Sequence, residues 1–307
     1  MRPKFPPLWT WGSAFSLVVI LVFLIGSSTV IDLRTGFGAN YESFKKRLAN
    51  LKSTYLVKPE DKVVVIIGSS FTAMSIDHRP YFYERYKRER GGDLHVIKLY
   101  MFGNNAERLQ KLPDFFEVLE FLHPDVVCLE EHLLAFDKQD VGQLNSTAWI
   151  SDFRLGVNAL KNQVFPSVEE EERNEVETFE FFWKYHQESF GADSLEVTTS
   201  DSLKARSYQS NVRLNAWLNK YLSDSTQLVC LTIPRPAYIE NGLTSAKADK
   251  VYEELQGAYQ ANFNIKYWAY QEELPYLMFS GDAHLNAQGM HLFSDWLYQQ
   301  IDKYFHP

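Results

Sequence analysis

Four short apolar runs along the chain have the pattern of strands in a parallel sheet. The clearest is Val63 to Ile67, five consecutive β-branched residues, and a run without polar alternation is typical of a strand buried on both faces. The other three runs are Leu94 to Tyr100, Asp125 to Leu129 and Gln227 to Ile233. Helical patterns separate the strands, so the order predicts an α/β fold with βαβ units and a parallel sheet.

The helical stretches have apolar residues three or four positions apart. Residues 41–56 form one such stretch and residues 106–122 another, in which Pro113 must break or kink the helix. The clearest is the last, because Asn286 can cap a helix that follows it. One face of that final helix carries Met290, Phe293, Trp296, Leu297, Ile301 and Tyr304.

An uncharged stretch from Leu8 to Ile31 follows a short basic N-terminus that contains Arg2 and Lys4. A span of about 20 apolar residues crosses a bilayer. The sequence therefore predicts a single transmembrane anchor over residues 8–31, in contact with the lipid bilayer. Arg2 and Lys4 favour a cytoplasmic N-terminus.

The anchor divides the chain into parts. We expect residues 1–7 in the cytoplasm, residues 32–60 as a juxtamembrane helix or linker, and residues 61–307 as an exported domain, periplasmic or extracellular. A cleaved signal peptide is the alternative, since Gly26 and Ser28 have the spacing of a cleavage site.

A long stretch, about residues 136–225, separates the third predicted strand from the fourth. It contains an acidic run from Glu169 to Glu172 and an aromatic cluster from Phe179 to Tyr185. Charge runs are usually solvated and aromatic clusters usually belong to a core. We expect a mostly helical insert that caps the domain and is able to line a substrate groove.

Composition narrows the classes of function. The chain has 39 acidic and 31 basic residues, a net charge of −8, which argues against a nucleic-acid surface because such a surface needs a basic face. The two cysteines, Cys128 and Cys230, lie inside apolar runs. Buried free thiols are expected, and a disulfide stays open because the sequence does not fix the geometry.

Two motifs carry candidate chemistry. Ser70 ends the motif Gly68-Ser69-Ser70 after the first strand, at the edge where α/β proteins bind ligands, and free amides at the next segment suit a substrate oxygen. Asp282 and His284 lie just before the last helix, and a carboxylate can orient a nearby imidazole. Taken singly, a serine N-cap and a solvated loop histidine are the simpler interpretations.

Taken in order, these motifs resemble the SGNH (GDSL-like) hydrolase superfamily. The nucleophile loop follows the first strand, Gly103 follows the second, and the Asp/His motif precedes the final helix. The resemblance covers residues 62–307 apart from the insert. It implies a three-layer, flavodoxin-like parallel sheet. It also implies Ser70 as nucleophile, His284 as general base, Asp282 as the acid that orients it, and the amides of Ser70 and Gly103 as oxyanion donors.

The sequence departs from the superfamily pattern after the third strand. An asparagine normally binds the oxyanion there, whereas this chain has Glu130-Glu131-His132, and losing one such donor typically costs ~10²–10³ in turnover. His132 or Asn104, or Asn105 beside it, is the candidate replacement. In most of the superfamily the acid lies three residues before the histidine. Here Asp282 lies two residues before His284, as in the branch that resembles alginate O-acetylation proteins.

The resemblance implies a membrane-anchored serine esterase or O-acyltransferase that acts on acyl esters of cell-envelope glycans or lipids. Its implied partners are an envelope polysaccharide or lipid substrate and a membrane-bound O-acyltransferase that delivers the acyl group. No cofactor and no nucleic acid are expected. A non-catalytic envelope-assembly protein with the same fold remains the alternative.

Two other sites fit the sequence less well. An α/β-hydrolase elbow needs a glycine where Thr72 stands. No metal is expected either, because the chain lacks a recognised ligand spacing among the residues that would form such a site: Asp77, His78, His132, Asp282, His284 and His291.

Overall fold

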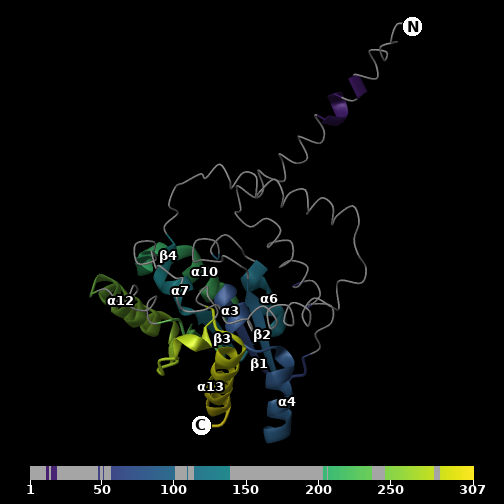
Figure 1. Ribbon diagram of the computed structural model, residues 1–307, viewed down its shortest axis with the longest axis vertical. Coiled ribbons are helices and arrows are strands. Elements are labelled where there is room, and N and C mark those ends of the chain that lie inside the picture. Colours follow the sequence, from purple (N-terminus) through teal and green to yellow (C-terminus); the bar gives the residue numbers. More distant parts are fainter. Residues whose placement is uncertain are drawn as a thin grey trace. The chain divides into compact units, whose positions relative to one another are not determined.

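The computed structural model describes residues 57–100, 114–138, 203–205, 207–236, 246–279 and 284–307 (Figure 1). It also describes residues 12–13, 15–18, 48, 51 and 109. The chain divides into two units, residues 1–43 with 142–169 and residues 44–141 with 170–307. Of the first unit, only the helical residues 12–13 and 15–18 are described, and all are exposed.

Several predictions fall on other parts of the chain. The anchor at residues 8–31, the linker at 32–60 and most of the insert at 136–225 lie largely outside the described residues. Within the described residues, no helix combines the length and the apolar character that a membrane crossing requires.

The second unit contains a five-stranded, fully parallel sheet. Its strand order is β2-β1-β3-β6-β7, the flavodoxin-like order of doubly wound sheets, so the α/β prediction is confirmed. The strands are β1 (Lys62–Gly68), β2 (Leu94–Tyr100), β3 (Val126–Glu130), β6 (Gln227–Thr232) and β7 (Lys266–Ala269).

The four predicted strands correspond to β1, β2, β3 and β6. Strand β7 was not predicted, because it is a short edge strand in which only Trp268 is buried. A separate two-stranded antiparallel sheet pairs β4 (Phe136–Lys138) with β5 (Leu203–Ala205).

The helices cover both faces of the sheet. The chain passes from β1 to β2 on one side and then back past β1 to β3, so right-handed crossovers place the two connecting helices on opposite faces. The α-helices whose bounds the described residues of the unit give are α3 (Ser70–Ser75), α4 (Arg79–Arg90), α6 (Asp114–Leu122), α7 (Glu131–Ala135), α10 (Val212–Tyr221), α12 (Ala246–Phe263) and α13 (Ala287–Phe305).

The helix α6 begins directly after Pro113, where a break was predicted. It packs against α10, which occupies the end of the predicted insert, and the rings of Phe116 and Trp217 meet edge to face at 5.2 Å. Leu214 and Leu218 of α10 are fully buried. The end of that stretch is therefore part of a helix layer.

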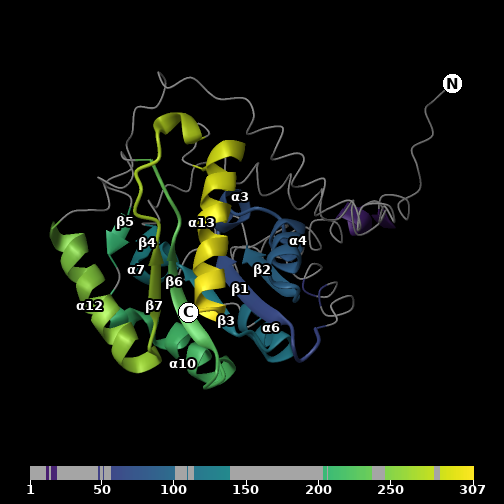
Figure 2. The same cartoon turned by 90° about the horizontal axis from the view of Figure 1, so that it is seen from below.

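The last helix, α13, covers the face of the sheet that carries Val64 and Ile66, and Figure 2 shows it lying along the strands. Asn286 caps it as predicted, because its side chain accepts a hydrogen bond from the Gly289 N–H at 3.0 Å. The predicted apolar face is the buried one: Met290, Phe293, Leu297 and Ile301.

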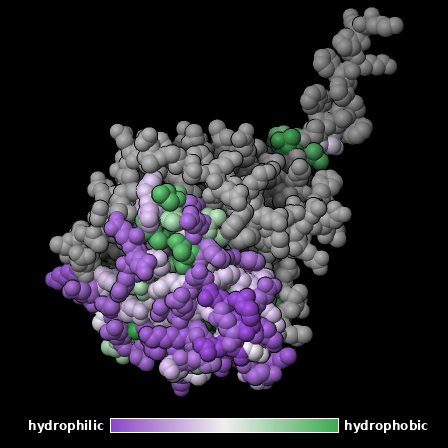
Figure 3. Space-filling model, turned by 60° about the horizontal axis from the view of Figure 1, so that its bottom comes forward, coloured by the Kyte–Doolittle hydropathy of each residue, from purple (hydrophilic) through white to green (hydrophobic). Residues whose placement is uncertain are grey.

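The surface in Figure 3 is mostly hydrophilic and carries a small apolar area. Two of the exposed large hydrophobic residues, Tyr276 and Leu277, belong to the 3₁₀ turn η4 (Tyr276–Met278), which leads toward the final helix. In the interior, Cys128 and Cys230 lie on adjacent strands as buried free thiols, as expected. Burial raises the pKa of both thiols.

Candidate active site

The turn after β1 places two serines in different surroundings. Ser69 is the N-cap of α3 and is buried, whereas Ser70 is the first residue of α3 and is partly exposed. Only a glycine fits before them: a Cβ on Gly68 would lie 1.7 Å from Thr72 Oγ1 and 2.4 Å from Glu130 Oε2. The turn therefore depends on a close approach of the backbone to these two side chains.

The structure brings Ser70 and His284 together at the carboxyl edge of the sheet. His284 Nε2 lies 3.0 Å from Ser70 Oγ, within hydrogen-bond reach of a nucleophile and its base. The imidazole also stacks on the ring of Phe71, with ring centroids 4.7 Å apart. The side chain that follows the serine therefore packs against the imidazole.

The backbone around His284 is held from both sides. Leu285 is fully buried and forms a β-bridge with Phe279, and the Asn286 N–H donates to the Met278 carbonyl at 2.8 Å. Asn286 then caps α13. The position of His284 therefore depends on the packing of η4 against the start of α13. The sequence also placed His284 just before a packed helix.

Glu130 lies directly beneath the turn Gly68-Ser69-Ser70 and is only 2% exposed. The Ser69 N–H donates to Glu130 Oε2 at 2.7 Å, the Ser69 hydroxyl donates to Oε1 at 2.9 Å, and the Thr72 hydroxyl donates to Oε2 at 2.7 Å. Sequence reasoning placed this residue in an oxyanion loop and missed these contacts. These contacts depend on the register between β1 and β3, which the sequence does not show. Ile67 pairs with Leu129, so Glu130 lies beside Gly68.

Glu131, the second carboxylate in the Glu130-Glu131-His132 segment, has a different partner. Glu131 Oε2 accepts a hydrogen bond from Arg235 Nη2 at 2.8 Å, and both side chains are largely buried. Burial, with the charge of Glu131 beside it, raises the pKa of Tyr252. Glu131 therefore joins α7 to the loop after β6.

Other predicted site residues lie outside the described part of the chain. These are Asp282, Gly103, Asn104 and Asn105, and the side chain of His132 in α7 is also not described. Their roles as orienting acid or oxyanion donors stay predictions. The remaining predicted donor, the Ser70 amide, is in the first turn of α3, where N–H groups have no acceptor inside the helix.

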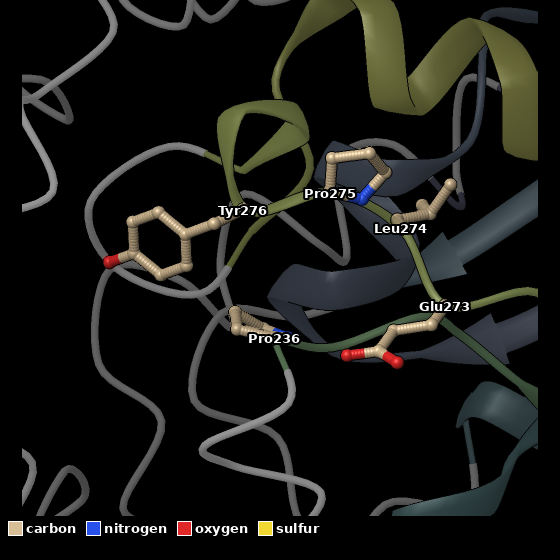
Figure 4. A pocket seen from close by; sticks show the side chains of 5 residues that line it. All are labelled: Pro236, Glu273, Leu274, Pro275 and Tyr276. Atoms are coloured by element: carbon tan, nitrogen blue, oxygen red, sulfur yellow. The ribbon is translucent and has the colours of Figure 1, made fainter.

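A shallow hollow of about 240 Å³ opens at the same edge of the sheet (Figure 4). It lies between the loop after β6 and the segment that leads from β7 into η4. Phe279, just after η4, forms a β-bridge with Leu285, the residue that follows His284. Its lining combines apolar rings with one carboxylate: Pro236, Glu273, Leu274, Pro275 and Tyr276.

A second polar cluster joins the end of α3 to α13. The buried carboxylate of Asp77 contacts Nδ1 of His78 at 2.5 Å and Nδ1 of His291 at 3.3 Å. Burial acts to raise the pKa of Asp77, but the hydrogen bonds from His78 and His291 outweigh it, so the pKa lies below its ordinary value. Among the described residues, no group of three or more His, Cys, Asp or Glu side chains is arranged to hold a metal ion.

Comparisons with known proteins find similarity only among solved structures. No protein-family model matches the chain, and no curated protein matches it. A lipase/acylhydrolase from Enterococcus faecalis is 13% identical, with 79% of this chain and 96% of that chain covered and a TM-score of 0.39. A GDSL-like lipase from Bacteroides thetaiotaomicron is 12% identical, with coverages of 84% and 97% and a TM-score of 0.39.

A psychrotrophic esterase from Pseudoalteromonas, in a form inhibited by monoethylphosphonate, is 13% identical, with 80% of this chain and all of that chain covered and a TM-score of 0.43. Identities and TM-scores this low carry no conclusion about activity. These three solved structures are a lipase/acylhydrolase, a GDSL-like lipase and an esterase.

Proposed function

We propose that the second unit is a serine esterase or O-acyltransferase that works through an acyl-Ser70 intermediate. The observation that carries this proposal is the 3.0 Å contact between Ser70 Oγ and His284 Nε2 at the carboxyl edge of the sheet. A hydroxyl is a weak nucleophile until an adjacent base removes its proton. This assignment is supported by the positions of Ser70 and His284, which lie on a turn and a loop that are both held by buried contacts.

The proposed chemistry has two halves. Ser70 Oγ attacks the ester carbonyl while His284 Nε2 takes its proton, and the oxyanion of the tetrahedral intermediate is held by the Ser70 amide. His284 then gives the proton to the departing alcohol, leaving an acyl-serine. In the second half His284 removes a proton from water or from an acceptor hydroxyl, which attacks the acyl group, and His284 then returns this proton to Ser70 Oγ as the acyl–serine bond breaks. Asp282 as orienting acid and Gly103 as second donor rest on the resemblance alone.

The proposed setting is the cell envelope, where the unit acts on acyl esters of glycans or lipids. It is supported by the uncharged segment at residues 8–31, which we propose anchors an exported domain and brings it beside a membrane-bound O-acyltransferase. The hollow at this edge of the sheet offers a place for substrate, because Tyr276 and the two prolines provide apolar surface and Glu273 provides a hydrogen-bond acceptor.

The test follows both products of a small activated ester, p-nitrophenyl acetate, with the full-length protein in detergent. Ester cleavage that is lost in Ser70→Ala and retained in Ser223→Ala, an exposed serine elsewhere on the unit, supports the proposal. Added oligosaccharides distinguish an O-acyltransferase from an esterase. Acetylated sugar indicates transfer, and hydrolysis that the sugars leave unchanged indicates an esterase. Cleavage at equal rates in wild type and Ser70→Ala would overturn it.

A further inference from the structure

The nucleophile helix is too short to hold itself in place. Helix α3 has six residues, and isolated helices of fewer than about 12 residues are marginal in water. Its position must therefore come from its neighbours. Two charged side chains from adjacent strands, Glu130 of β3 and Lys98 of β2, contact its two ends.

Glu130 binds the residues on both sides of Ser70. At position 69 it accepts from the backbone N–H at 2.7 Å and from the hydroxyl at 2.9 Å, and at position 72 it accepts from the hydroxyl at 2.7 Å. Because one carboxylate holds the residue before Ser70 and the residue two positions after it, the turn cannot rotate without breaking these bonds. The rotation of the turn decides whether Ser70 Oγ points at His284.

We propose that Glu130 is the positioning residue that fixes the nucleophile turn, an inference that rests on the proposed function. The carboxylate is buried, and a buried charge is costly unless it is hydrogen-bonded. The Ser69 N–H, the Ser69 hydroxyl and the Thr72 hydroxyl donate to it, and a carboxylate is able to accept hydrogen bonds through both of its oxygens. Gly68 contributes by having no side chain, because a Cβ there would lie 2.4 Å from Glu130 Oε2.

The opposite end of α3 has the opposite charge. Lys98 Nζ donates to the Ile76 carbonyl at 2.6 Å and lies 3.5 Å from the Ala73 carbonyl. A negative charge at a helix N-terminus and a positive charge at its C-terminus both interact favourably with the helix dipole. The two strands that flank β1 thus fix both ends of the helix that carries the candidate nucleophile.

A role in stability alone would give a different result from a role in positioning. Glu131 provides the matched control, because it is the next residue, is also largely buried, and is paired with Arg235 in the loop after β6. Glu130→Gln keeps the size of the side chain but presents an amide N–H₂ to donors at Ser69 or Thr72. Glu131→Gln removes a carboxylate of similar burial from the same loop.

The experiment compares the full-length protein with both variants and with Ser70→Ala. We expect the rate constant for Ser70 phosphonylation by a fluorophosphonate to fall about 10²-fold in Glu130→Gln, the scale of a small misplacement of reacting groups, and to stay at the wild-type value in Glu131→Gln. With p-nitrophenyl acetate, kcat should fall while KM is unchanged. Hydrogen exchange should quicken at the amides of residues 69–72 in Glu130→Gln only.

Each outcome decides the inference. Equal labelling rates in the two glutamine variants would overturn it while leaving the proposed function intact. If wild type and Ser70→Ala are both unreactive, the proposed function fails, and hydrogen exchange at residues 69–72 still shows whether Glu130 fixes the turn. Should Glu130→Gln fail to fold, Thr72→Val removes one of the described donors to Glu130 while keeping the carboxylate, and an unchanged labelling rate there overturns the proposal.

Discussion

Ser69 and Ser70 are adjacent in the chain, yet their hydroxyls are bound to different parts of the fold. Ser69 Oγ donates to the buried Glu130 at 2.9 Å, and Ser70 Oγ lies 3.0 Å from His284 Nε2. One serine therefore belongs to the scaffold of the turn and the other faces the base. This division supports our proposal of Ser70 as the nucleophile, and it makes Ser69 a structural partner of Glu130.

Replacing His284 should remove the base and leave the fold intact. We expect His284→Ala to lower kcat for p-nitrophenyl acetate by about 10²–10⁴-fold, the usual contribution of general base catalysis, with little change in KM. The comparison variant is His306→Ala, because His306 lies just beyond the C-terminal end of α13 and contacts Tyr86 at 3.1 Å. Similar turnover in the two variants would exclude His284 as the base.

Gly68 should tolerate no side chain. In Gly68→Ala the new Cβ would displace Thr72 and Glu130, and forcing atoms into a well-packed interior typically costs about 1–3 kcal/mol. A Cβ added to Gly257 in α12 would meet open space, so Gly257→Ala should be neutral or stabilising by up to about 1 kcal/mol. Urea unfolding of both variants measures the difference, and equal free energies of unfolding would show that the turn is not tightly packed.

Asp77 should make stability depend on acid pH. Its folded-state pKa lies below the ordinary 3.8, so its contribution to the free energy of unfolding is complete above the unfolded-state pKa and is lost as pH falls through the lower folded-state value. The melting temperature of wild type should therefore fall more than that of Asp77→Asn between about pH 5 and about pH 2. Parallel melting curves for the two proteins over that range would contradict the assignment.

The sequence predicted most of the sheet because its inner strands are continuous apolar runs. Val63 to Ile67 is buried residue by residue, and the runs at Leu94 and Gln227 begin where β2 and β6 begin. Strand β7 was not predicted because a four-residue edge strand with one buried residue has no recognisable hydrophobic pattern in the sequence.

The site was predictable only where a single motif carries it. Ser70 follows a strand and His284 precedes a capped helix, so each position is visible locally. The role of Glu130 depends on how β1 and β3 align, since pairing of Ile67 with Leu129 brings Glu130 beside Gly68. A one-residue shift would turn the carboxylate to the other face, and register between distant strands is not visible in either segment alone.

The most direct test of the account is to find which residue a fluorophosphonate modifies. Full-length protein is incubated with the probe, digested, and the peptide spanning residues 68–75 is sequenced by mass spectrometry, with Ser70→Ala and the surface variant Ser223→Ala in parallel. The account predicts a single adduct on Ser70, formed equally in Ser223→Ala and absent from Ser70→Ala. An adduct on Ser69, or labelling that persists in Ser70→Ala, would contradict it.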